Sequence, residues 1–181
     1  MDERAWVDGL RRGDAAAFDG AFAAYRRRVY GYLVRMTRNK DTAEDLLQET
    51  FLRLAQSAKK LAPDTRLAPY LFTIAHRLVV SWARAQQVRA QLAGEFVEPV
   101  DHRSPLEAVA DSQTQLALER AFAALAPAYR EVALLVGVEG MQPSEVAAIL
   151  GQTPEAVRQR LARARGQLAE SLGAHYPGDE R

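Results

Sequence analysis

Apolar residues recur every three to four positions along most of this chain, which is the spacing of a buried helix face. In the first half, the pattern predicts helices over about 3–12, 14–38, 41–58 and 70–92. Gly13 ends the first helix, and Pro63 and Pro69 keep 59–69 a loop. The side chains expected to face this core are Trp6, Val7, Leu10, Phe18, Phe22, Tyr25, Val29, Tyr32, Leu33, Met36, Ala43, Leu46, Leu47, Thr50, Phe51, Leu54, Leu71, Ile74, Ala75, Leu78 and Val79.

The periodic pattern lapses over 94–112, where proline, glycine and scattered acids predict a flexible linker. It resumes with predicted helices over about 113–125, 128–138, 143–150 and 154–172, followed by a polar tail. Alternating strand-like runs are absent from the sequence. We therefore predict an all-α fold with two small helical domains, 1–93 and 113–173, a flexible acidic linker over 94–112, and a tail over 174–181.

A helix-turn-helix pattern lies within 144–168. Val146, Ala147 and Leu150 form the apolar face of a short helix that Gly151 can end, because glycine adopts positive φ freely. Thr153 and Pro154 suit the cap and first position of the next helix. Its core positions are Val157, Leu161, Ala164 and Leu168, and its other faces carry Arg158, Gln159, Arg160, Arg163 and Arg165. Such a helix can enter a DNA major groove.

The net charge of +1 conceals a segregated distribution of charge. The segment 66–89 contains arginine and histidine but no acid, and Tyr70, Phe72 and Trp82 lie among its basic residues. Exposed aromatic rings of this kind can stack on unpaired bases while arginines hold phosphates. The alternative is that Phe72 and Trp82 belong to the core, with the arginines solvated around them.

The predicted third helix carries Asp45, Gln48 and Glu49 on the face opposite its apolar residues. This arrangement fits either an ordinary solvated surface or a docking face for a basic or amide-rich partner. The spacing alone does not decide between them.

Composition excludes several other classes of protein. The chain has no cysteine, so it has neither disulfides nor a thiolate metal site. Its three histidines lie in separate segments, and it has neither a glycine-rich phosphate loop nor a serine nucleophile motif. We expect no enzymatic activity, no metal and no cofactor. The start of the chain lacks a signal-peptide core and no apolar run is long enough for a membrane span, which predicts a soluble cytoplasmic protein.

Three blocks of the sequence together resemble one bacterial family. DTAEDLLQETFLRL (41–54) and PYLFTIAHRLVVSWAR (69–84) resemble the first conserved domain of extracytoplasmic-function (ECF) sigma factors. The block at 124–168 resembles their second conserved domain, and the order of the blocks matches too. The resemblance implies a protein that binds core RNA polymerase, recognises promoter DNA and helps to melt it. It also implies an inhibitory anti-sigma factor as a partner.

The resemblance assigns roles to particular residues. Asp45, Gln48 and Glu49 match the patch that docks on the coiled coil of the polymerase clamp. The fourth helix and the loop before it match the element that recognises the −10 region and captures an unstacked base; the matching residues are Arg66, Tyr70, His76, Arg77, Trp82 and Arg84. The last helix matches the element that recognises −35 DNA in the major groove, through Thr153, Glu155, Arg158, Gln159, Arg160, Arg163 and Arg165.

Physical chemistry divides these −35 roles further. Arg160 and Arg165 suit phosphate anchoring, and Arg163 is a further candidate phosphate contact. Arg158 and Gln159 suit bidentate contacts to guanine and adenine edges. Glu155 either accepts from a cytosine amino group or only stabilises its own helix end.

The chain departs from the family pattern at four positions. Arg77 stands where many members have Asn, Ser81 where they have Asp, Tyr70 where they have Trp, and Gln142 where they have a Ser or Thr cap. A stand-alone helix-turn-helix regulator is the competing hypothesis, and an adaptor acting only through the acidic helix is another. Neither uses both the acidic and the basic surfaces.

Overall fold

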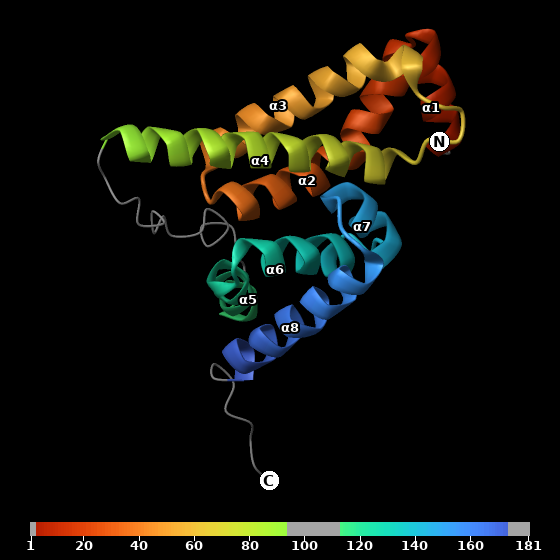
Figure 1. Cartoon of the computed structure of the whole chain (residues 1–181). Helices are drawn as coiled ribbons and strands as arrows, with labels where there is room; N and C mark the ends of the chain where they lie inside the picture. Colours follow the sequence, from red (N-terminus) through yellow and green to blue (C-terminus); the bar gives the residue numbers. More distant parts are fainter. Residues whose placement is uncertain (1–2, 94–112, 174–181) are drawn as a thin grey trace. The chain divides into compact units, whose positions relative to one another are not determined.

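The structure, a computed structural model, describes residues 3–93 and 113–173 (Figure 1). Every regular element within these ranges is helical and none is a strand, which confirms the predicted all-α class. The chain divides into two compact units, 1–101 and 102–181, and each is described by itself below. The predicted linker (94–112) and tail (174–181) lie outside the described residues.

The first unit is built around its second helix. Helix α2 contacts α1, α3 and α4, and α3 also contacts α4. The bounds are α1 Glu3–Arg12, α2 Ala15–Thr37, α3 Lys40–Ser57, a 3₁₀ turn at Ala58–Lys60, and α4 Leu67–Ala93.

Local caps set the helix boundaries in this unit. Gly13 adopts φ +78° between α1 and α2, where the sequence predicts the first helix to end. The Asp14 carboxylate caps α2 by accepting from the Ala16 N–H at 2.9 Å. The third helix begins earlier than predicted. Asn39 is its cap rather than part of a turn, because the Asn39 side-chain oxygen accepts from the Thr42 N–H at 2.8 Å and lets the helix start at Lys40.

The core of the first unit is centred on Tyr32 and Phe72, whose rings meet edge to face at 5.5 Å. Some predicted core residues, namely Trp6, Phe18, Phe22, Met36, Leu46, Leu47 and Ile74, are only partly buried. Ala17 and Ala21 are buried instead. A Cβ added at Gly9 would overlap the Ala17 side chain, so α1 and α2 approach closely where both residues are small.

Helix α4 starts three residues before its predicted start at Tyr70. Pro69 does not prevent this, because it lies in the first turn, where a missing N–H costs no helical hydrogen bond. Leu61 and Leu67, which fall in the predicted loop, are buried and hold it against the unit.

The second unit is organised around its last helix, which contacts each of the other α-helices. The bounds are α5 Gln113–Ala124, α6 Pro127–Val132, a π-helical segment Ala133–Val138, α7 Pro143–Leu150, and α8 Pro154–Gly173. The predicted single helix over 128–138 is therefore α-helical only in its first part. In the rest the backbone hydrogen bonds span five residues instead of four, and the Glu139 N–H donates to the Leu134 carbonyl at 2.9 Å.

A buried arginine joins α5 to α6. The Arg130 guanidinium donates to the carbonyls of Phe122, Ala123 and Leu125 at 2.8–2.9 Å. These carbonyls lie at the end of α5, where a helix leaves acceptors without partners. The charge of Arg130 thereby completes α5 and holds the next helix in place.

Candidate nucleic-acid interface

The turn between α7 and α8 has the geometry that the sequence predicts. Gly151 ends α7 at φ +63°, and its N–H donates to the Ala147 carbonyl. The Thr153 hydroxyl caps α8 by accepting from the Ala156 N–H at 3.2 Å. The N-terminus of α7 is completed by Glu145, whose carboxylate accepts from the Gln142 N–H at 2.9 Å. Because the Glu145 carboxylate satisfies the Gln142 N–H, Gln142 can stand at a cap position that favours Ser or Thr.

Helix α8 buries one stripe and leaves the rest open. Val157, Leu161 and Ala164 are buried as predicted, while Leu168 is half-buried. In α7, Val146 and Ala147 are buried, but Ile149 takes the buried place expected for Leu150. The predicted DNA-contacting residues are consequently exposed or half-buried, outside the buried stripe of α8.

Glu155 and Arg158 form an ion pair at 2.9 Å on this open surface. Both side chains are more than half exposed, so the pair contributes little to stability. The carboxylate also lies in the first turn of α8, where its negative charge interacts favourably with the helix dipole. The negative charge offsets part of the attraction that Arg158 would exert on a phosphate or a guanine.

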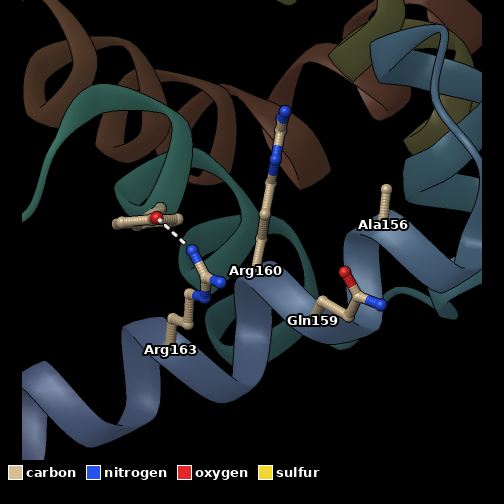
Figure 2. Close-up of a pocket in the computed structure, with 5 residues that line it drawn as sticks. Ala156, Gln159, Arg160 and Arg163 are labelled. Carbon is tan, nitrogen blue, oxygen red and sulfur yellow. Dashed lines mark hydrogen bonds between the residues drawn. The ribbon is translucent and has the colours of Figure 1, made fainter.

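A hollow of about 330 Å³ lies between α6 and α8 (Figure 2). It is lined by Tyr129 from α6 and by Ala156, Gln159, Arg160 and Arg163 from α8. The Arg163 guanidinium donates to the Tyr129 hydroxyl oxygen at 3.3 Å, and this bond raises the pKa of Arg163. The lining contains two guanidinium groups, an amide and a phenol, and no carboxylate.

The seven predicted −35 residues therefore separate into groups. Gln159, Arg160 and Arg163 share the hollow, and Glu155 pairs with Arg158. Thr153 is committed to capping, and Arg165 is exposed beyond the hollow. Tyr129 also lines the hollow, although the sequence pattern does not indicate it. Its only sequence signal is that a polar aromatic residue stands in the first turn of a helix, at a position outside the core spacing.

On α4 the predicted −10 residues occupy several faces. Arg77 and Arg84 are exposed, Arg66 is exposed just before the helix, and His76, Trp82 and Tyr70 are half-buried. Tyr70, Arg77 and Arg84 are seven residues apart, which places them on one face. The Tyr70 hydroxyl donates inward to the Ser57 hydroxyl at 2.8 Å.

Phe72 cannot stack on a base, because it is fully buried against Tyr32. For this ring the core alternative is correct. Trp82 is only half-buried, so part of its ring is accessible to a base.

The acidic surface of α3 contains an apolar residue that the core spacing does not explain. Asp45 and Gln48 are exposed, and the Glu49 carboxylate accepts from Arg53 at 2.7 Å. Leu52 is 51% exposed, four residues after Gln48 and three after Glu49. It therefore lies on the same face as the polar residues. The available sequence signal was that Leu52 is apolar but falls outside the core positions Thr50, Phe51 and Leu54.

Within residues 3–93 and 113–173, no group of histidine, cysteine and acidic side chains is placed to hold a metal ion. None of the described helices is long and apolar enough to cross a membrane.

Comparison with known proteins gives matches over both units. The model of sigma-70 region 2 matches residues 21–89, and that of sigma-70 region 4 matches 115–168. The RNA polymerase sigma factor CarQ of Myxococcus xanthus is 37% identical over 168 residues, which cover 92% of this chain and 95% of CarQ. The ECF RNA polymerase sigma factor SigE of Mycolicibacterium smegmatis is 31% identical, with 90% of this chain and 65% of SigE covered, so the chain spans about two thirds of SigE.

A solved structure resembles the chain in three dimensions. It is the sigma factor RpoE of Bartonella quintana, crystallised with the anti-sigma factor NepR. The TM-score is 0.74 at 25% identity, and the match covers 91% of this chain and 98% of RpoE.

Proposed function

This chain belongs to the ECF sigma factors of the sigma-70 family, and on that premise we propose how its surfaces divide the work of starting transcription. It is a promoter-recognising factor whose two domains bind core RNA polymerase and promoter DNA. The observation that carries this function is the presence of both sigma domains, in order, in one chain. A stand-alone helix-turn-helix regulator would account for the second domain only. Sigma factors direct the chemistry of the polymerase, and we assign no reaction to this chain itself.

The first domain, 1–93, docks on the polymerase and recognises the −10 element, while the second, 113–173, recognises the −35 element. The segment 94–112 joins them and 174–181 forms a tail. Because core polymerase is the partner, we place the protein in the cytoplasm.

The surface of this chain that docks on the polymerase consists of Asp45, Gln48, Glu49 and Leu52. The exposed carboxylates and amide provide acceptors for basic and amide side chains, and Leu52 provides an apolar centre. Interfaces of this kind gain most of their free energy at such a centre, with polar groups around it. Arg53 holds the Glu49 carboxylate in the free protein, and a basic group of the clamp would take over that contact.

Promoter melting is assigned to α4 and the segment before it. Arg66, Arg77 and Arg84 contact phosphates, with Tyr70 and His76 beside them, and Trp82 stacks on an unpaired base. Arg77 stands where an Asn amide would contact a base edge, so we expect the first domain to gain phosphate affinity and lose some base discrimination.

Recognition of the −35 element is assigned to α8. Arg158 and Gln159 contact base edges, Arg160, Arg163 and Arg165 contact phosphates, and Thr153 holds the N-terminus of the helix in position. Glu155 stabilises the helix end and restrains Arg158 rather than contacting DNA, because the two side chains already form an ion pair.

We also infer that an anti-sigma factor inhibits this chain. The support is the likeness to RpoE, which was crystallised with the anti-sigma factor NepR. Such an inhibitor would cover the docking surface of α3 and keep the factor from the polymerase. A chain that is fully active in cells under every growth condition would contradict this inference.

Transcription with purified core polymerase and a genomic fragment library tests the function directly. We expect the wild-type chain to yield discrete transcripts and the Gln48→Ala/Glu49→Ala variant to lose both transcripts and core binding. Asp19→Ala, which removes an exposed carboxylate from α2, should retain both. Failure to bind core, together with tight specific binding of the free chain to duplex DNA, would instead indicate a stand-alone regulator.

A further inference from the structure

The hollow between α6 and α8 gathers hydrogen-bond donors without a countercharge. Arg160 has no carboxylate partner among the described residues, and the partner of Arg163 is the neutral Tyr129 hydroxyl. Arg158, one position before Gln159, differs because Glu155 already pairs with it. Both arginines that line the hollow are therefore available to an outside anion.

Tyr129 gives this site a fixed wall. It projects from α6, a helix held by the buried Arg130 at the next position. Its hydroxyl oxygen accepts from Arg163, so its own proton is left to donate into the hollow. The bond also restrains the Arg163 side chain, which otherwise loses considerable rotamer freedom when it binds a ligand.

We propose that this hollow is a binding site for a single phosphate group, in which Tyr129 positions Arg163 and itself donates a hydrogen bond. The inference rests on the proposed function, because it identifies the ligand as a phosphodiester of the −35 backbone. Planar guanidinium groups suit phosphate oxygens, and a tetrahedral anion with several acceptors matches the two guanidinium groups, the amide and the phenol. A backbone phosphate is favoured over a free phosphate because the hollow adjoins the face of α8 that carries Arg158 and Gln159.

This assignment separates the arginines of α8 by task. Arg160 and Arg163 fix the position of the helix along the DNA backbone, which leaves Arg158 to contact bases. Contacts to phosphate add affinity without sequence preference, and each one adds to the salt dependence of binding.

The experiment measures binding of the holoenzyme to a promoter recovered in the transcription experiment, at several salt concentrations. Tyr129→Phe keeps the ring and removes the hydroxyl, and we expect binding to weaken by about three- to tenfold. Arg163→Ala should weaken it further and reduce the salt slope by about one. Tyr30→Phe, which removes a hydroxyl in the other unit, and Arg120→Ala, which removes an exposed charge from α5, serve as matched controls and should bind like wild type.

Neutral methylphosphonate linkages, placed one at a time along the −35 element, then locate the phosphate. One position should weaken the wild-type complex and have much less effect on the Arg163→Ala complex, because both changes remove the same contact. If no position shows this coupling, or if Tyr129→Phe binds like wild type, the proposed site is wrong. If inorganic phosphate binds the holoenzyme at submillimolar concentration and is lost in Tyr129→Phe, while DNA binding is unchanged, the ligand is a free phosphate instead. Holoenzyme that forms and transcribes in each case leaves the proposed function intact, whereas failure to bind core contradicts the function itself.

Discussion

The Glu3 carboxylate accepts a hydrogen bond from the Leu67 backbone N–H at 2.7 Å, across 64 residues of sequence. The same oxygen accepts from the Tyr25 hydroxyl at 2.9 Å. Leu67 is the first residue of α4, where backbone donors lack helical partners. The first helix of the chain thus supplies the cap of α4, the helix to which we assign promoter melting.

Removing this carboxylate should destabilise the first unit. We expect Glu3→Ala to lower its free energy of unfolding by about 2 kcal/mol, because two hydrogen bonds to a charged acceptor are lost. Glu3→Gln, which keeps an acceptor oxygen, should cost less. Asp8→Ala is the matched control on the same helix, since Asp8 makes only a long, exposed pair with Arg11 at 3.9 Å. Urea unfolding monitored by circular dichroism measures all three, and equal losses for Asp8→Ala and Glu3→Ala would contradict the capping role.

Tyr25 makes the stability of this unit fall at alkaline pH. Burial first, and then the hydrogen bond and charge of Glu3, raise the pKa of Tyr25 from 10.0 to about 12. A raised pKa in the folded state gives stability that is complete below pH 10 and is lost as the pH rises to about 12. Tyr30 also has a raised pKa and contributes in the same direction.

Tyr25→Phe isolates the contribution of Tyr25. The difference in unfolding free energy between wild type and Tyr25→Phe should be constant below pH 10 and should shift in favour of the variant above it. Denaturant unfolding at a series of pH values measures this difference. A difference that stays constant up to pH 12 would show that the phenol is not perturbed.

Two glycines of α2 should respond to alanine in opposite ways. A Cβ at Gly20 would lie 2.5 Å from the Trp6 indole nitrogen, so Trp6 would have to move, and we expect a loss of about 1 to 3 kcal/mol. At Gly31 the nearest atom is a guanidinium nitrogen of Arg35 at 3.2 Å, the end of a long side chain that donates to the Gly31 carbonyl and can shift slightly. Gly31→Ala should therefore stabilise the helix by about 0.5 to 1 kcal/mol. Thermal unfolding distinguishes the two, and stabilisation by Gly20→Ala would contradict the packing of α1 on α2.

Phe72 should affect stability rather than DNA. Phe72→Ala removes a fully buried ring beside Tyr32 and should cost about 3 to 5 kcal/mol. Phe72→Leu, which fills most of the space, should cost less and should keep promoter opening at temperatures where it is folded. Reactivity of unpaired thymines to permanganate measures opening. If the Phe72→Leu variant is as stable as wild type but cannot open promoters, Phe72 contacts DNA after all.

Neutralising Glu155 should distinguish its two proposed roles. If the carboxylate only restrains Arg158 and favours the helix dipole, Glu155→Gln should strengthen promoter binding by about twofold to fivefold, since a charge of the same sign as DNA is removed. If it accepts from a cytosine, the substitution should weaken binding and relax the base preference at one position of the −35 element. Competition binding with single-base variants of the promoter separates these outcomes.

Much of the architecture follows from local features that the sequence displays. Periodic apolar positions determine the helices, and four residues mark their ends. Gly13 and Gly151 adopt positive φ, while the side chains of Asp14 and Thr153 accept hydrogen bonds from backbone N–H groups two or three residues away. The helix-turn-helix is predictable for the same reason. The basic and acidic surfaces are equally local, since residues three, four or seven apart on a helix share a face whatever surrounds it.

What the tertiary structure alone decided depends on residues that meet across the fold. The start of α4 at Leu67 follows from the carboxylate of Glu3, which no pattern near residue 67 could predict. The contact with Tyr32 decides between the two interpretations of Phe72 that the sequence left open. Tyr129 enters the candidate site in the same way, because only the packing of α6 on α8 brings its hydroxyl to Arg163. The sequence by itself determined the helices and the charge on their faces, whereas contacts between distant residues decided which of those side chains share a site.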